Sequence, residues 1–564
     1  MKKIILSLMA GMVLFTGCDL LNNDPYDNFT KGNFFTSETN VEMYTNYFYA
    51  EWSGYGNNGT YGTFYFPTLN DNQAVTGITP WDFTTISATD GTWDASYEEI
   101  RRANILLENL DGVEMDKATM GYYQSLGRLY RAWQHFCVVR KFGDCYWVDH
   151  SLTTEDTDIL YGPRQNRNIV MDNILADLNY AVENMGDKNA DSRTAYNVYV
   201  AQAIKAQICL FEGTFAKYHK NDKERSDKYL AEARTAAEAI INSGNFALTP
   251  GAEGYRANYN SLELAGNTEM IMYKNYVQDV LRHATQDYCC GSTPTNGMSK
   301  SAFNAYLKKD GTLADPNDDH GVLGTEGYDA GKPVIYHLLE ARDPRLAQQI
   351  DGYLCYVGNN RARYEGVPGQ EGAAENTVTT GYGILKFDEP ETPSSLRQST
   401  TGNVTDCPLF WLAEIYLTHA EACAELGDEA AAKTSLNMLR ERVGMAPYTV
   451  AVNDPANTIG VSDLIWEIRR ERRVELMFDI NDRYWSLIRW HQLDLLDTEE
   501  YPDQTKGAWI DASWPGADQV KRDANGYIDL NDTYVRKFEE KHYLAPIPSG
   551  QIALNPAIGQ NPGW

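Results

Sequence analysis

The sequence predicts a mainly α-helical protein, in which hairpins of helices form a scaffold that carries long loops and a few short strands. Three observations lead to this fold class. Several segments repeat apolar residues every three or four positions, as amphipathic helices do. Helical segments come in pairs that end at glycine. The stretches 275–335 and 352–408 are rich in Gly, Asn, Asp, Pro and Tyr, a composition typical of loops.

The first helices are predicted at Glu42 to Tyr55, Ala95 to Leu110 and Met120 to Phe142. In each of them, aromatic and aliphatic side chains fall along one face, which is more typical of a buried core stripe than of a binding site. The third helix ends at Gly143, a helix stop signal. Between the first two, residues 54–62 combine Gly, Asn and Thr with Tyr61. An aromatic residue in such a loop is harder to explain as core.

Two later pairs of helices repeat one plan. They are predicted at Tyr196 to Phe215 with Lys228 to Ile241, and at Leu409 to Leu426 with Glu429 to Arg442. Alanines alternate with larger apolar residues in these helices. Small residues let two helices approach closely, as they do in tetratricopeptide hairpins, so the scaffold is predicted to be tetratricopeptide-like. A short strand is expected at Glu269 to Lys274.

The domain organisation is predicted to be simple. The length of 564 residues would allow three or four domains of about 150 residues each. However, no Pro- or Ser-rich linker and no low-complexity block divides the chain. We therefore expect one helical binding body over residues 41–564, with ligand loops at about 54–93 and 275–335, because binding residues concentrate on loops that a rigid scaffold positions.

The N-terminus has the features of an export signal. Lysines precede an apolar run that ends at Phe15 and is too short to span a membrane. Thr16-Gly17-Cys18 follows and resembles a bacterial lipobox, although Phe15 stands where such boxes usually carry Leu. We predict a signal peptide at residues 1–17, lipidation of Cys18 and a tether at residues 18–40. The alternative is an ordinary signal peptide with an incidental cysteine.

Charge and cysteine content narrow the classes of partner and site. The formal net charge of −29 argues against nucleic acid and anionic lipid as partners, because their phosphates would be repelled. No paired Cys-x-x-Cys spacing of a zinc site occurs. Cys209 and Cys423 lie in apolar helical runs and are expected in the core. Cys137 and Cys145 are able to pair in an oxidising compartment, and the sequence leaves their state open.

The sequence contains no recognisable catalytic or cofactor motif. Gly-x-Ser-x-Gly, His-Glu-x-x-His and Gly-x-x-x-x-Gly-Lys-Ser/Thr are absent, and the histidines show no metal spacing. Acidic residues at 315–320 are suitable calcium ligands, but they lack the EF-hand spacing, and a solvated acidic loop explains them better. With 78 acidic residues, any chosen carboxylate pair for glycoside hydrolysis is uninformative. We expect a protein that is not an enzyme and has no metal or cofactor.

A series of short motifs carries a resemblance to a known family. In chain order they are Arg140–Asp144, Asp343-Pro344-Arg345, Trp411–Leu417 with His419–Ala422, Leu439–Met445, Glu471–Leu476, Asp482–Trp485, Leu544–Pro548 and Asn555–Trp564. Their order resembles that of the SusD/RagB family, from the lipobox to the last residue. Phe410-Trp411 departs from it, because family members often have a basic residue there. Taken alone, the mixed charges of Arg469 to Glu475 indicate a paired face, either solvated or interior.

The resemblance implies a fold, a location and a function. Members of this family are outer-membrane, cell-surface lipoproteins in which four tetratricopeptide-like hairpins support variable ligand loops. They form a lid over a SusC-like TonB-dependent transporter and pass captured glycans, or in some cases peptides, to its channel. We therefore expect a glycan-binding lipoprotein that delivers oligosaccharides or polysaccharides to such a partner. Peptide or other nutrient capture on the same scaffold, and scaffolding without a ligand, are the alternatives.

Candidate ligand residues lie in the two predicted loop regions. Sugars present C–H faces, which aromatic rings cover, and hydroxyls, which Asp, Asn and Arg side chains bind. Residues that suit this chemistry in these regions are Tyr61, Asp71, Asn72, Trp81, Arg282, His283 and Tyr288. Trp81 is the first choice, because it follows Thr-Pro in a turn-like stretch, and Asp71 lies near the place where the resembled family often has a loop Asp. Simple packing is the alternative for each aromatic residue.

Overall fold

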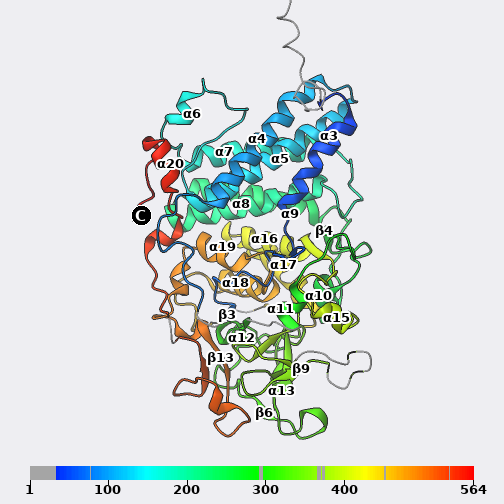
Figure 1. Ribbon diagram of the computed structural model, residues 1–564, viewed down its shortest axis with the longest axis vertical. Coiled ribbons are helices and arrows are strands. Elements are labelled where there is room, and N and C mark those ends of the chain that lie inside the picture. Colours follow the sequence, from blue (N-terminus) through cyan, green and yellow to red (C-terminus); the bar gives the residue numbers. More distant parts are fainter. Residues whose placement is uncertain are drawn as a thin grey trace, which may run out of the picture.

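Long helices form one end of the molecule, and short strands with loops form the other (Figure 1). The computed structural model describes residues 34–75, 78–290, 296–364, 367, 370, 375–449, 453–531 and 534–564. The predicted signal peptide, Cys18 and the tether up to residue 33 lie outside these residues. Within the described part of the chain, no helix has the length and apolar character needed to cross a lipid bilayer.

The end with the long helices is built from the N-terminal part of the chain. Its helices are α3 (Glu38–Thr45), α4 (Gly91–Asn109), α5 (Lys117–Phe142), α6 (Thr157–Tyr161), α7 (Arg167–Asn184), α8 (Val198–Lys220) and α9 (Lys223–Ile241). Side-chain caps begin several of them: Asp90 accepts hydrogen bonds from the first turn of α4, and Asn197 does the same for α8. α5 packs against α4 and α7, and α8 packs against α9. The predicted helical scaffold is confirmed, and α7 is a helix that the prediction omitted.

A second pair, α16 (Leu412–Glu425) and α17 (Glu429–Arg442), continues the scaffold. α16 packs against both α8 and α9, although the chain of the other half lies between them in sequence (Figure 1). Glycine permits the close contact of α8 with α9, since a Cβ on Gly213 would lie 2.7 Å from Leu230 Cγ. The helices therefore approach as tetratricopeptide-like hairpins do. The helices α18 (Asp463–Glu475), α19 (Asp482–Arg489) and α20 (Ser549–Leu554) complete the C-terminal part.

Part of one predicted helix is a strand. Leu409 to Trp411 belong to β12 (Cys407–Trp411), which pairs antiparallel with β4 (Met270–Lys274), and α16 begins only at Leu412. All residues of β12 are buried. An apolar run that is buried on both faces has no alternating pattern, so its periodicity does not separate a strand from a helix. The strand predicted at Glu269 to Lys274 is confirmed as β4.

The first predicted helix is shorter than expected. α3 ends at Thr45, a 3-10 helix (Asn46–Glu51) follows, and the backbone is extended at Trp52. A tighter 3-10 turn at the end of an α-helix is common. The aromatic stripe nevertheless lies in the core as predicted, since Phe48 is fully buried and stacks on the Tyr130 ring at 4.0 Å.

The other half combines short helices with small sheets. Its helices are α10 (Gly251–Asn260), α11 (Thr285–Cys290), α12 (Lys300–Asn304), α13 (Tyr336–Ala341), α14 (Leu346–Gln349) and α15 (Ser394–Arg397). A four-stranded antiparallel sheet has the order β11 (Tyr382–Ile384), β8 (Ile350–Leu354), β7 (Pro333–Val334) and β6 (Val322–Leu323). Two-stranded sheets pair β9 (Arg361–Ala362) with β10 (Glu375–Asn376), and β13 (Lys506–Trp509) with β14 (Tyr527–Asp529). β3 (Gln73–Val75) pairs with β5 (Asn296–Met298), which joins the two predicted loop regions.

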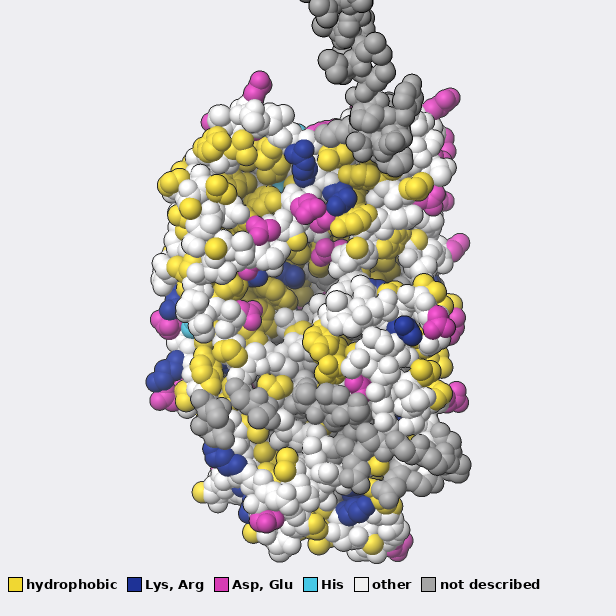
Figure 2. Space-filling view, viewed as in Figure 1, with side chains coloured by type: hydrophobic (Ala, Val, Ile, Leu, Met, Phe, Trp, Pro, Cys, Tyr) yellow, Lys and Arg dark blue, Asp and Glu magenta, His cyan; other side chains and the backbone are white. Residues whose placement is uncertain are grey.

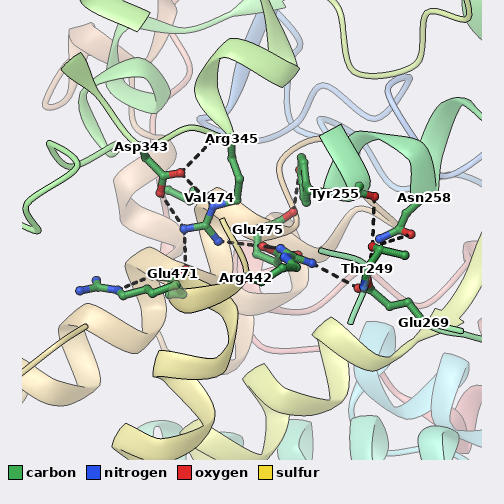
Figure 3. A network of polar contacts seen from close by, with 12 residues as sticks. Thr249, Tyr255, Asn258, Glu269, Asp343, Arg345, Arg442, Glu471, Val474 and Glu475 are labelled. Atoms are coloured by element: carbon green, nitrogen blue, oxygen red, sulfur yellow. Dashed lines mark hydrogen bonds and ion pairs between the residues drawn. The ribbon is translucent and has the colours of Figure 1, made fainter. Parts of the chain in front are cut away.

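Charged residues of the sequence motifs form a buried network (Figure 3). The Arg345 side chain is fully buried, and its Nη2 lies 2.6 Å from Asp343 Oδ2 and 2.5 Å from Glu471 Oε1. Its Nη1 lies 2.7 Å from Glu475 Oε2, which also pairs with Arg442 at 2.6 Å. The network connects α17 and α18 to the turn that precedes α14. The mixed charges of α18 are therefore an interior salt-bridge face, one of the two alternatives that the sequence left open.

Cysteines that the sequence left undecided are unpaired. Cys137 of α5 and Cys145 are both buried and free. Burial raises the pKa of each thiol to about 12, so neither is a reactive thiolate at neutral pH. Cys209 and Cys423 are buried in helices, as predicted.

Candidate functional site

Two tyrosines from separate predicted loops meet at the molecular surface. The Tyr61 and Tyr288 hydroxyl oxygens lie 2.6 Å apart, and their rings meet edge to face with 5.3 Å between centroids. Phe66 stacks on Tyr61 at 4.4 Å with an interplanar angle of 20°. Tyr61 remains 56% exposed, so the group leaves aromatic surface open to solvent. We call Tyr61, Phe66 and Tyr288 the tyrosine platform.

A tight hairpin positions Tyr61. β1 (Gly56–Asn57) and β2 (Thr60–Tyr61) are joined by Asn58 and Gly59, whose φ angles are 40° and 102°. Positive φ at both turn residues suits a two-residue hairpin, and Asn-Gly adopts it readily. A Cβ on Gly56 would lie 2.0 Å from the Thr60 carbonyl oxygen, so that position requires glycine. The glycines and Asn58 therefore determine where Tyr61 stands.

The second loop is attached to this hairpin through its backbone. Asn58 N donates to the Arg282 carbonyl oxygen at 2.7 Å, and Arg282 N donates to Asn58 Oδ1 at 3.0 Å. The Arg282 guanidinium lies 3.6 Å from the carboxylate of Asp279, which is largely exposed. An exposed ion pair contributes little stability, so this guanidinium can rearrange towards a ligand at small cost. Arg282 thus lies beside the turn that carries Tyr61.

Tyr288 is held by α11 and by a buried neighbour. Its carbonyl oxygen accepts a hydrogen bond from the Tyr65 hydroxyl at 2.5 Å. The hydrogen bond with Tyr61, together with partial burial, raises the pKa of Tyr288 to about 12. The Tyr288 phenol is therefore protonated at neutral pH, where it can donate or accept a hydrogen bond.

The tyrosine platform combines flat apolar faces with hydroxyl groups. Aromatic faces cover the C–H faces of a sugar ring, while phenol and guanidinium groups exchange hydrogen bonds with its hydroxyls. This chemistry suits reversible capture of a polar, ring-shaped ligand.

Asp71 and Asn72 are buried, and each is bonded to an arginine side chain. Arg483 Nε lies 2.7 Å from Asp71 Oδ1, and Arg473 Nε donates to Asn72 Oδ1 at 2.8 Å. Burial alone would raise the pKa of Asp71, but Arg473 and Arg483 outweigh it and hold that pKa well below its usual range. Both predicted ligand residues therefore anchor their loop to α18 and α19. Their contact with a ligand stays a prediction that this arrangement does not favour.

Trp81 and His283 are also buried rather than presented to solvent. Trp81 is 6% exposed, donates from Nε1 to the Lys537 carbonyl oxygen at 2.7 Å and stacks on His542 at 4.3 Å. The His283 ring is fully buried and bonds from Nε2 to the Thr405 carbonyl oxygen at 3.1 Å. Burial lowers the pKa of His283 to about 3, so its ring is neutral. For Trp81, the packing alternative of the sequence fits this environment better than ligand binding.

One platform residue was missed by the sequence prediction. Phe66 lies in the same aromatic loop as Tyr61, five positions further along, and is half-buried, whereas Phe64 and Tyr65 between them are buried. Composition alone did not separate these three aromatic residues. The available signal was Pro67, which directly follows Phe66 and favours an extended residue before it.

Potential metal ligands among the described residues are scattered. No group of three or more His, Cys, Asp or Glu side chains that could hold a metal ion occurs in that part of the chain. Asp319, in the acidic stretch at 315–320, is buried and accepts a hydrogen bond from the Tyr527 hydroxyl at 2.8 Å.

Comparison with protein families gives two matches. The model of the SusD family matches residues 268–564, and a model described as starch-binding and associating with the outer membrane matches residues 19–210. A SusD-like protein of Bacteroides ovatus is 21% identical over 100% of this chain and 98% of its own. The starch-binding protein SusD of Bacteroides thetaiotaomicron is 26% identical over 43% of this chain and 37% of its own.

Solved structures share the fold. A SusD-like protein of Bacteroides fragilis aligns with a TM-score of 0.65 and 22% identity, covering 96% of this chain and 100% of its own. A protein described as a laminarin-binding SusD-like protein aligns with a TM-score of 0.56 and 19% identity, covering 94% and 100%. A structure with a xylogluco-oligosaccharide has a TM-score of 0.61 and 16% identity, covering 93% and 99%. At these identities the likeness concerns the fold.

Proposed function

Because the chain belongs to the SusD family, we propose that it is a cell-surface lipoprotein that captures glycans and delivers them to a partner TonB-dependent outer-membrane transporter. The captured ligands are oligosaccharides or polysaccharides, and the partner is a SusC-like transporter. Cys18 carries the lipid anchor, which holds the protein at the outer membrane. Binding, not catalysis, is the activity.

The tyrosine platform is the observation that carries this proposal. Its rings are packed against one another, which limits the entropy lost on binding, and Tyr61 is still 56% exposed. An exposed aromatic face of this kind can stack on the C–H face of a sugar ring. Arg282, beside the same hairpin, supplies hydrogen-bond donors for sugar hydroxyls.

The described ligands of similar proteins support a carbohydrate as the ligand class. They are laminarin for one structural relative, a xylogluco-oligosaccharide for another and starch for a more distant sequence relative. These ligands differ from one another, so similarity to these proteins does not identify one glycan. The ligand of this protein is therefore to be found with a panel of polysaccharides.

The test uses a soluble form that begins at Asp19. Native gels that contain single polysaccharides identify a glycan that retards the protein, and titration calorimetry then gives the affinity. We expect Tyr61→Ala and Tyr288→Ala to weaken binding about tenfold each, since one lost aromatic contact is worth about 1.4 kcal/mol. Tyr161→Ala is the matched control, because Tyr161 is similarly exposed at 63% and belongs to α6.

Two results would overturn parts of the proposal. If both platform variants and the Tyr161→Ala control bind the glycan with wild-type affinity, the platform is not the site. If no glycan binds but peptides do, peptide capture on the same scaffold replaces the proposed function.

Anchor and partner are tested in cells that express the full-length chain. Cys18→Ala should abolish labelling by a fatty acid and release the protein from the membrane fraction. Affinity purification of the tagged wild-type protein should recover a TonB-dependent transporter. Absence of labelling on the wild-type protein would exclude the lipid anchor.

A further inference from the structure

A concave surface lies between the long helices and the C-terminal helices, and none of the three platform residues lines it. Residues of α5, α8, α16, α18 and α19 line a groove of about 200 Å³. Figure 2 shows this face of the molecule hollowed below the long helices, at the level of α8 and α19 in Figure 1. Aromatic rings and charged groups share its walls.

The aromatic wall of the groove is preorganised. The Trp52 ring lies 4.9 Å from that of Trp133 and 4.9 Å from that of Phe410, and Trp52 Nε1 donates to the Tyr196 hydroxyl at 2.7 Å. Trp485 of α19 stands on the groove as well. These rings keep their orientation without a ligand, so they can cover an apolar ring face at little entropic cost.

Arg140 is the distinctive charge of the groove. Its guanidinium carbon lies 4.2 Å from the Trp485 ring centroid, 5.3 Å from that of Phe136 and 5.7 Å from that of Trp133. No carboxylate oxygen among the described residues lies within 4.0 Å of it, and its hydrogen bond is a 4.0 Å contact with Cys137 Sγ. Arg140 is thus a cation held by aromatic rings, with no carboxylate from the described part of the chain beside it.

The other two arginines of the groove each have a carboxylate partner. Arg472 Nη2 lies 2.5 Å from Asp482 Oδ1, and Arg489 forms an ion pair with Glu421. Their charges are compensated within the protein. Arg140 therefore differs from these two arginines in having no carboxylate partner among the described residues.

The remaining carboxylates of the groove already have donors. Glu51 accepts from Trp133 Nε1 at 2.7 Å, and Glu414 accepts twice from Gln207 Nε2, at 2.7 and 2.8 Å. They are turned to those partners, so Arg140 has no internal anion to recruit. They also limit the negative charge that the groove tolerates, which favours an anion of one charge over a sulfate or phosphate dianion.

We propose that this groove is a second ligand site that takes a single sugar ring bearing one carboxylate, a hexuronic acid residue, with Arg140 as the carboxylate-binding residue. Guanidinium binds carboxylate with two parallel hydrogen bonds, and the aromatic wall covers the ring. The volume of about 200 Å³ is below the ~300 Å³ where pockets for drug-sized ligands begin, so it suits one ring rather than a chain. The site is independent of the tyrosine platform.

The test compares sugars that differ only at C6. The soluble protein is titrated with D-glucuronic and D-galacturonic acid and with D-glucose and D-galactose, by calorimetry and by tryptophan fluorescence. We expect each uronic acid to bind at least about tenfold more tightly than its parent sugar. The fluorescence should change on binding, because Arg140 contacts Trp485.

Variants assign the effect to Arg140. Arg140→Gln should remove the preference for the uronic acid, whereas Arg128→Gln should keep it. Arg128 is a matched control, because it lies on the same helix and also covers an aromatic ring, that of Tyr180 at 4.2 Å, but is paired with Asp177 at 3.0 Å. Circular dichroism and the melting temperature establish that each variant is folded.

Two further outcomes separate this site from the proposed function. Tyr61→Ala should still bind uronic acids, and Arg140→Gln should still be retarded by the polysaccharide. The proposal is overturned if uronic acids bind no better than their parent sugars, or if Arg140→Gln keeps the preference. Should Arg140→Gln fail to fold, Trp485→Phe serves instead, and it must remove the fluorescence change while uronic acid binding persists.

Discussion

Replacing Arg345 by Met removes the cation at the centre of the buried network while keeping most of the side-chain volume. Two of its three carboxylate partners retain another arginine, because Glu475 keeps Arg442 at 2.6 Å and Glu471 keeps Arg440 at 3.0 Å. Among the described residues, Asp343 has no cationic partner besides Arg345, and it is 2% exposed. The substitution therefore leaves one orphaned carboxylate in the interior.

The magnitude follows from that one charge. Breaking a buried ion pair by removing one partner costs about 3–5 kcal/mol, because the remaining charge is neither paired nor hydrated. We expect Arg345→Met to lower the free energy of unfolding by this amount. Adding Asp343→Asn removes the orphaned charge, so the double variant should be more stable than Arg345→Met alone.

The assay is urea unfolding of the soluble protein, followed by tryptophan fluorescence and circular dichroism. Lys223→Met is the control, since the Lys223–Asp227 pair is exposed and its loss should leave stability unchanged within error. A loss below about 1 kcal/mol for Arg345→Met, or a double variant less stable than the single one, would refute the argument that Asp343 is orphaned.

Three further predictions follow from buried groups. Burial alone would raise the pKa of Glu421, but Arg489 outweighs it and holds that pKa at about 2 against 4.5 when unfolded. The pair therefore stabilises the fold above pH 4.5 and loses about 3 kcal/mol as the pH falls to 2, a dependence that Glu421→Gln should flatten in acid titrations. Trp81→Ala should cost about 3–5 kcal/mol of stability in urea and leave polysaccharide retardation unchanged; the reverse pattern would restore Trp81 as a ligand residue. The buried, free Cys137 and Cys145 should react with Ellman's reagent only after unfolding, whereas reaction in the folded protein would contradict their burial.

Helix positions were predictable where apolar spacing and local stop signals agree. Glu429 to Arg442 was predicted and is α17, since Asp428 caps its first turn and Gly444 follows its end. β12 was not predictable, because its buried residues carry no period and its partner β4 lies far away in sequence. Tertiary pairing, not local preference, makes that segment a strand.

The candidate site shows the same limit. Tyr61 and Tyr288 were chosen because aromatic residues in Gly- and Asn-rich loops are hard to explain as core, and the structure brings them together. The two tyrosines are 227 residues apart in the sequence, and they meet because their loops pair with each other, as β3 does with β5. Composition does not reveal such pairing. Asp71 looked equally suitable, but whether a loop carboxylate faces a ligand or an arginine depends on what packs over it.

The packing of α16 against α8 and α9 has a consequence for how this protein folds and opens. In a linear repeat array each hairpin contacts the next one along the chain, so such arrays can unfold from an end. Here residues 242–411, which include most of the mixed half, separate α9 from α16, so the face of α9 that α16 covers stays open until this segment brings the two helices together. Backbone amides of α9 and α16 should accordingly show the same protection in hydrogen exchange, because one opening event exposes both helices. Folding should also be slow for a protein so rich in helix, because this contact joins segments that are far apart in the sequence.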